Sequence, residues 1–332
     1  MYDTASNAAA ETATGNASTL RARTRERVRY PKRCKSHSST HPLLADLIRV
    51  LALERLEYDL FCGESRDIGT AQVFGGQVIA QALGAAYQTV DERPVHSLHA
   101  YFLRRGNINA PIVYEVERAR DGASFSSRRV SATQHGEEIL NMAVSFQRPE
   151  RGFEHQFDMP DVPPPERLPS AHTLAADAEL HLPARLRKVL ARASPFEFRF
   201  ADPLHFMPTV DAHCMQHLWF RALGRLPDDP CLHGRLLAYV SDYYLLSTAV
   251  RPHSHDLGRS AALAISVDHA IWFHRPARVD EWLLYAIDSP SASGARGFTR
   301  ASIFTSEGRL IASTAQEGLM RTAPHAPLER KI

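Results

Sequence analysis

Residues 260–321 read SAALAISVDHAIWFHRPARVDEWLLYAIDSPSASGARGFTRASIFTSEGRLIASTAQEGLMR, and this stretch decides the fold. Its segments SVDHAIWFHRP, EWLLYAIDSPSASGARGF and LIASTAQEGLMR each read as a long strand. Each segment also carries polar residues where a plain sheet would carry only packing residues. The stretch therefore predicts long consecutive strands that carry candidate functional residues.

A degenerate copy of this pattern occurs earlier, as HSLHAYFLRRG, PIVYEVERARDGASFSSRRV and EEILNMAVSF. His99-Ala100, followed by Phe102, corresponds to His269-Ala270, followed by Trp272. A repeat of this length predicts two structurally related halves in one chain.

Each half is expected to contain a central helix. Residues 73–90 include FGGQVIAQALGAAYQT, which has no charged residue, and a helix without a charged face is normally buried. Residues 236–250 stand at the corresponding place in the second half. One buried helix followed by antiparallel strands is the hotdog arrangement. The sequence thus predicts an α+β double hotdog with its two sheets side by side.

The composition sets the domain boundaries. We expect a disordered basic arm over residues 1–41, because residues 1–40 hold eight Lys/Arg against three Asp/Glu and few large apolar residues. The first repeat should span 42–148, beginning with a short amphipathic helix. A Pro-rich linker with a helix should span 149–195, the second repeat 196–322 and a tail 323–332.

Composition also excludes several functions. No apolar run approaches the roughly 18 residues that span a membrane, and the mildly acidic globular part argues against nucleic-acid binding. The four scattered cysteines suit a reducing compartment, and the C-terminus LERKI is not a peroxisomal signal, so we expect a cytoplasmic protein. No GxSxG, GxGxxG, GxxxxGK[ST] or HExxH motif is present.

Three polar residues of the second half stand out. Asp242 is the only charged residue of the apolar segment 236–250, and burying a carboxylate is costly unless something compensates. A helix-cap or turn carboxylate is the structural alternative. By strand alternation, Ser266 shares a face with Asp268, Ala270 and Trp272, and Gln316 lies on a small, mostly apolar face. A tolerated small residue and a sheet-edge hydrogen bond are their structural alternatives.

The histidines give weaker signals. His99 and His269 occupy equivalent repeat positions, which favours a structural role, although both, with Trp272, could line a substrate site. His253 and His255 lack further ligands at a familiar spacing, so we expect no metal.

The chain resembles the type II acyl-CoA thioesterases, the family of bacterial thioesterase II and the peroxisomal acyl-CoA thioesterases. The resemblance covers the globular part, from about residue 44 to residue 321. Its motifs stand in the family's order: VFGGQVIAQAL, RDGASFSSRRV, GFEHQ, VSD, VDHAIWFHRP, EWLLY, SASGARGF and STAQEGLMR.

The resemblance implies a double hotdog that hydrolyses fatty acyl-CoA to free acid and CoA without metal or cofactor. The family's catalytic trio of Asp, Thr or Ser, and Gln falls on Asp242, Ser266 and Gln316, with Ser where many bacterial members carry Thr. Asp242 would act as general base on a water that the trio orients. Backbone N–H groups at Gly75 and Gly76 are candidates for polarising the thioester carbonyl.

The CoA phosphates need basic side chains, for which the sequence offers Arg104, Arg105, Arg128, Arg129, Arg296 and Arg300. A nucleophilic Ser266 is a competing mechanism, but no motif assigns it a histidine base. A catalytically silent acyl-CoA binding protein and a hotdog hydratase are alternative functions. We also expect a homodimer or homotetramer, because such sheets often pair at their edges.

Overall fold

The computed structural model describes residues 41–69, 72–180, 182, 184–202, 214–253 and 262–322. Apart from His41, the expected basic arm lies outside these described residues, as does the expected tail 323–332. No helix within the described ranges is long and apolar enough to cross a membrane.

The elements of the two halves follow one another along the chain. The first half contains α1 (Pro42–Leu51), β1 (Glu54–Glu57), β2 (Leu60–Gly63), α2 (Gly75–Tyr87), β3 (Val95–Phe102), β4 (Ile112–Asp121), β5 (Phe125–Gln134) and β6 (Glu137–Gln147). The connecting segment contains η1 (Pro165–Arg167), α3 (Ala171–Ala176) and α4 (Ala184–Leu190). The second half contains β7 (Phe196–Phe200), β8 (Met215–Ala222), α5 (Pro230–Val240), α6 (Leu245–Val250), η3 (Arg251–His253), β9 (Ala262–Ser266), β10 (Asp268–Phe273), β11 (Leu283–Ser293), β12 (Arg296–Thr305) and β13 (Leu310–Thr322).

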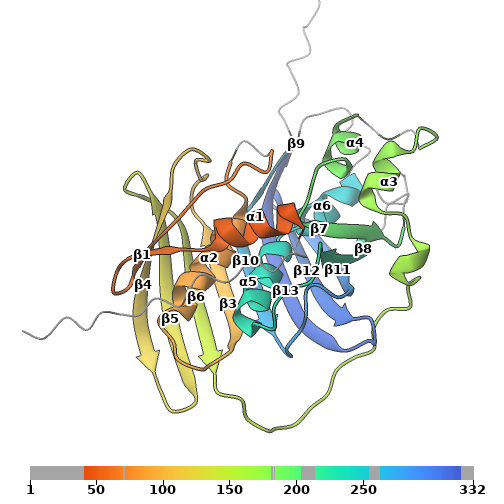
Figure 1. The fold of residues 1–332 in the computed structure, drawn as a ribbon. Helices are drawn as coiled ribbons and strands as arrows, with labels where there is room; N and C mark the ends of the chain where they lie inside the picture. Colours follow the sequence, from red (N-terminus) through yellow and green to blue (C-terminus); the bar gives the residue numbers. More distant parts are fainter. Residues whose placement is uncertain are drawn as a thin grey trace, which may run out of the picture. The chain divides into compact units, whose positions relative to one another are not determined.

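The strands form one continuous antiparallel sheet around the central helices α2 and α5 (Figure 1). Its order is β1-β2-β4-β5-β6-β3-β10-β13-β12-β11-β8-β7, and β9 pairs with β13. The two halves join where β3 pairs with β10. Helix α2 packs on β4, β5 and β6 and also on α5, so the two halves share one core. The double hotdog is confirmed.

Helix α2 is buried along its length, as its lack of charged residues predicts. Every residue from Gly76 to Ala86 is buried. The polar side chain of Gln81 is satisfied inside this core: its Oε1 accepts from the Tyr114 hydroxyl at 2.6 Å, and its Nε2 donates to the Val50 carbonyl at 2.6 Å. A buried amide with partners costs little, so the core tolerates it.

The second central helix differs from the prediction of a helix over 236–250. Helix α5 begins earlier because Asp229 caps its N-terminus, accepting from Cys231 N at 2.9 Å, and it ends at Val240. Tyr244 has a left-handed conformation (φ 65°), which interrupts the helix before α6 begins. Asp242 therefore lies in a tight turn between two helices, as the turn alternative proposed, and not within a helix.

The strand alternation expected around Ser266 is wrong, because the pairing slips at Val267. Ser266 pairs with Gly318, whereas Ala270 pairs with Ala315. Four residues on one strand thus face three on the other, and such a bulge turns the following side chains to the opposite face. Ser266 consequently points to the same side as the fully buried His269, away from the face of Trp272.

The pairing of β3 with β10 separates the two histidines that the repeat had made equivalent, because His269 pairs with Ala100 and not with His99. His269 is fully buried, whereas His99 is exposed and pairs with Ala270 across the sheet. The His99 ring lies edge-on to Trp272, with ring centroids 5.1 Å apart, on the outer face. The two histidines therefore lie on opposite faces of the sheet, and the expected equivalence of His99 and His269 is wrong.

Candidate active site

A cavity of about 370 Å³ lies where the two halves meet, and we call it the reaction cavity. The first half contributes the start of α2, including Gly75, and the loop after β3. The second half contributes Asp242 from the turn after α5 and Ser266 from the end of β9. Neither half alone could build this site.

Asp242 is held by the first turn of α2. Its Oδ2 accepts from the backbone N–H of Gly76 at 2.8 Å. The two glycines make this approach possible: a Cβ on Gly75 would lie 2.8 Å from Asp242 Oδ2, and a Cβ on Gly76 would overlap the carbonyl oxygen of Tyr239. The GG pair is thus explained by close packing of α2 against the turn after α5.

Burial raises the pKa of Asp242 from its ordinary value to about 7, because the carboxylate loses its solvation. The Gly76 N–H and the Gln316 amide oppose this rise, since they favour the charged form. The second oxygen, Oδ1, is buried and accepts no hydrogen bond of normal geometry from the described residues. A carboxylate with these properties is suited to accepting a proton near neutral pH.

Gln316 and Ser266 lie together beside this carboxylate. The Gln316 Nε2 donates to Ser266 Oγ at 2.5 Å, although the residues come from different strands. Gln316 is buried, whereas Ser266 borders the reaction cavity. Because the Ser266 oxygen accepts from the amide, its own proton is left to donate elsewhere. The structure thus brings Asp242, Ser266 and Gln316 together.

The sequence pattern did not predict the position of His269 beside Gln316. Its Nδ1 lies 2.9 Å from Gln316 Oε1, and its Nε2 lies 2.9 Å from Ser241 Oγ. Burial lowers the pKa of His269 to about 4, so the ring is neutral at pH 7. An amide oxygen can only accept, so Nδ1 carries the proton. The opposite amide orientation would bring the Gln316 oxygen, not its N–H, beside Asp242.

The remaining expected site residues lie elsewhere or act differently. His99 and Trp272 pack together on the outer face and are not part of the reaction cavity lining, and His269 lies behind Gln316. The N–H of Gly76 is engaged by Asp242, whereas Gly75 borders the cavity. Of the two glycines proposed to polarise the thioester carbonyl, only Gly75 keeps a suitable position.

The arginines that are candidates for binding the CoA phosphates fall into two groups. Arg104 and Arg105 border the reaction cavity, and Arg104 also forms an ion pair with Glu137 at 3.6 Å. The other candidates are engaged with acidic side chains elsewhere: Arg128 with Asp121 at 2.8 Å, Arg129 with Glu117 at 3.3 Å, Arg296 with Glu317 at 2.9 Å and Arg300 with Asp288 at 2.8 Å.

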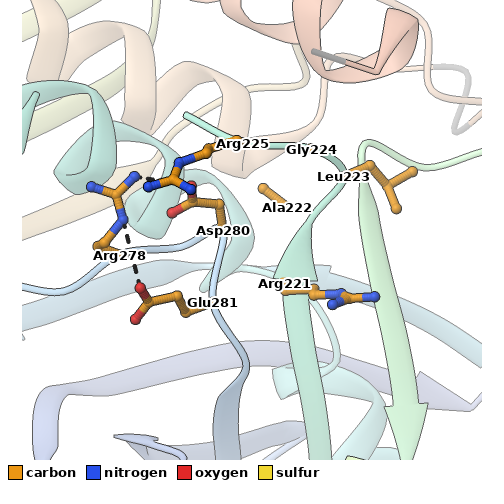
Figure 2. Close-up of a pocket in the computed structure, with 8 residues that line it drawn as sticks. All are labelled: Arg221, Ala222, Leu223, Gly224, Arg225, Arg278, Asp280 and Glu281. Carbon is orange, nitrogen blue, oxygen red and sulfur yellow. Dashed lines mark hydrogen bonds and ion pairs between the residues drawn. The ribbon is translucent and has the colours of Figure 1, made fainter. Parts of the chain in front are cut away.

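A further cavity of about 420 Å³ lies beside the end of β8 and the start of β11 (Figure 2). Arg278 there forms ion pairs with Asp280 at 3.0 Å and with Glu281 at 3.7 Å, and Arg221 and Arg225 lie nearby. Three arginines thus face two acidic side chains there, and none of the trio borders this cavity. Across the described ranges, no group of three or more His, Cys, Asp and Glu could hold a metal ion.

Comparisons with known proteins agree with this geometry. A family profile described as Acyl-CoA thioesterase matches residues 193–319, and one described as Acyl-CoA thioesterase N-terminal domain matches residues 64–147. Acyl-CoA thioesterase 2 of Haemophilus influenzae is 42% identical over 280 residues, which cover 84% of this chain and 98% of that relative. Human acyl-coenzyme A thioesterase 8 is 39% identical over 284 residues, covering 83% and 88%.

A solved structure gives the same result. Acyl-CoA thioesterase II TesB2 from Mycobacterium marinum is 40% identical, with a TM-score of 0.70, and the match covers 84% of this chain and 100% of that one. Since the relatives match nearly end to end and both halves match the family's profiles, the chain belongs to the type II acyl-CoA thioesterases, enzymes that hydrolyse acyl-CoA thioesters.

Proposed function

We propose that this chain hydrolyses acyl-CoA with a water that Asp242, Ser266 and Gln316 activate and orient. One observation supports this most directly: two groups able to hydrogen-bond a water, Asp242 and Ser266, border one cavity, and Gln316 bonds to Ser266 beside them. The raised pKa of Asp242, about 7, also suits a general base.

The reaction follows from these positions. Asp242 accepts a proton from the water while the water oxygen forms a bond to the thioester carbon, and the carbonyl oxygen becomes negatively charged. The Ser266 hydroxyl and the Gln316 amide fix the line of attack. The N-terminus of α2 at Gly75 offers a positive dipole end for the developing charge. The C–S bond then breaks, and the proton held by Asp242 passes to the departing CoA sulfur.

The structure favours water over Ser266 as the nucleophile. A serine nucleophile needs an adjacent base, and the buried histidine nearest in the network, His269, bonds to Gln316 and Ser241 instead. Its pKa of about 4 also makes it a weak base. Ser266 therefore serves as a hydrogen-bonding group in this proposal.

Release of free thiol from a panel of acyl-CoAs tests the function itself. The purified protein should release CoA from at least one acyl chain length, without added metal. A protein that binds acyl-CoA in a titration but releases no thiol from any of them would instead be the silent binding protein.

The pH dependence should report Asp242. The group must be deprotonated to accept a proton, so kcat/KM should rise about tenfold per pH unit below pH 7 and level off above it. An ordinary aspartate would give a plateau already from about pH 5. Initial rates between pH 5 and 9, with substrate well below KM, measure this profile. A plateau across that whole range would contradict the assignment.

Arg105 should bind a phosphate of CoA at the mouth of the reaction cavity. The side chain is exposed, and Arg104 beside it is bonded to the Glu138 carbonyl at 2.8 Å. Arg105→Ala should raise KM about five- to tenfold with little change in kcat, and added salt should narrow this difference.

Two controls show whether the effect of Arg105→Ala on KM comes from a contact with a CoA phosphate. Hydrolysis of an acyl-N-acetylcysteamine thioester, which has no phosphate, should not respond to Arg105→Ala. Arg129→Ala removes an exposed arginine away from the cavity and should leave the KM for acyl-CoA unchanged. Equal effects of Arg105→Ala on both substrates would exclude a phosphate contact.

A further inference from the structure

A second cavity lies directly behind the catalytic turn. Its volume is about 550 Å³, larger than the reaction cavity, and aromatic residues of α5, the following turn and β7 line it. We call it the tyrosine cavity, defined by Tyr239, Tyr243, Tyr244, Phe196 and Phe198. Protein interiors are normally close-packed, so an apolar space of this size beside a reactive carboxylate calls for an occupant.

The tyrosine cavity and the reaction cavity share a wall. Phe74 borders the reaction cavity, Tyr243 borders the tyrosine cavity, and their ring centroids lie 4.7 Å apart in an edge-to-face contact. Asp242 faces one cavity and the next residue, Tyr243, borders the other. A thioester held at Asp242 would thus lie one aromatic pair away from the second space.

The charged groups around the tyrosine cavity already have protein partners. Arg66 pairs with Asp46 at 3.0 Å, Arg192 donates to the Gly69 carbonyl at 2.9 Å, and Glu197 accepts from arginines on β7 and β8. Burial raises the pKa of Tyr239, Tyr243 and Tyr244, so their hydroxyls stay neutral. An occupant would meet a mainly apolar wall whose charged side chains are already bonded within the protein.

We propose that the tyrosine cavity receives the distal part of long acyl chains, with the Phe74–Tyr243 pair as the gate between it and the reaction cavity. This inference rests on the proposed function. The direction of the substrate supports it, because Arg104 and Arg105 border the reaction cavity and the Arg105 prediction assigns the CoA phosphates to that side. The acyl chain then leaves the thioester on the other side. Phe74 there contacts Tyr243 and Tyr239 edge-on, with ring centroids 4.7 and 5.1 Å apart, and each such pair contributes only about 1 kcal/mol beyond its buried area.

Two variants should move chain-length preference in opposite directions. Ala171→Phe adds a ring at the wall of the tyrosine cavity, where Ala171 is partly buried. It should lower the ratio of kcat/KM for palmitoyl-CoA to that for butyryl-CoA by about tenfold, the cost of displacing two methylenes. Phe74→Ala opens the gate and should raise this ratio. Leu223→Trp narrows the same cavity and serves if Ala171→Phe folds poorly; Leu223 also borders the cavity of Figure 2, for which the control variant accounts.

Arg225→Trp adds similar bulk to the cavity of Figure 2 and should not change the ratio. A ratio that no cavity variant changes, in an enzyme that still hydrolyses acyl-CoA, would overturn the inference and leave the function intact. An equal loss for all chain lengths would point to the adenine ring of CoA as the occupant and also overturn it. Failure of the wild type to hydrolyse any acyl-CoA would remove the function and the inference together.

Discussion

Replacing Asp242 with asparagine should lower kcat for acyl-CoA hydrolysis by about 10²- to 10⁴-fold, the range expected for loss of a general base. Asparagine has nearly the same size and can still fill the place beside Gly76, but it cannot accept the proton of the attacking water. Steady-state release of free thiol measures the loss. The residual rate should also lose the dependence on a group with a pKa near 7.

Asp288→Asn is the matched control for Asp242→Asn. Asp288 pairs with Arg300 at the surface, at 2.8 Å, and does not border the reaction cavity. Its replacement removes the same charge and should change kcat less than about twofold, since isolated surface ion pairs contribute little. Equal activity of wild type and Asp242→Asn would exclude Asp242 as the base, whatever the activity of the control.

The Tm of the Asp242→Asn variant distinguishes a loss of catalysis from a loss of folding. Burial holds the pKa of Asp242 at about 7 in the folded protein, above that of the unfolded chain. The folded state therefore binds the proton more tightly, and this contribution to stability is present at low pH and lost as pH rises through 7. Asp242→Asn should accordingly have a higher Tm than wild type at pH 8, with a smaller difference at pH 5.

Much of the fold could be predicted from the sequence, because it rests on local patterns. The absence of charge in FGGQVIAQALGAAY predicts a buried helix, and α2 is buried throughout. The repeated strand segments predict two related halves. The pairing of β3 with β10, which makes one sheet of the two, depends on contacts between halves that no local pattern contains.

The arrangement of the site was harder to predict, because it depends on two irregularities. The slip at Val267 reverses the alternation, and this turns Ser266 toward the interior. The left-handed Tyr244 ends the helical run and leaves Asp242 in a turn, although a bulky residue is rarely found in that conformation. Motifs could identify the residue types, but only the register of β9 and β10 shows that His269 lies behind Gln316.

His269 should act as a positioning residue for Gln316. Its Nδ1–H donates to Gln316 Oε1, and this fixes the amide so that Nε2 points toward Ser266 and Asp242. His269→Leu should therefore lower kcat by about 10²-fold with little change in KM, because a misplacement of about 1 Å costs that much in rate, whereas CoA binds elsewhere. His269→Asn should recover most of the loss, since its amide can supply an N–H near the place of Nδ1.

A double-mutant cycle distinguishes this role from general support of the core. If His269 acts through Gln316, then His269→Leu should cost less than about threefold in a Gln316→Ala background, because the group it positions is already gone. Losses that simply multiply would assign His269 to the core instead, as would an asparagine variant no better than leucine. A Gln316→Ala variant with full kcat would take Gln316 itself out of the reaction. Rates for wild type, both single variants and the double variant, each with its Tm, are sufficient to decide among these outcomes.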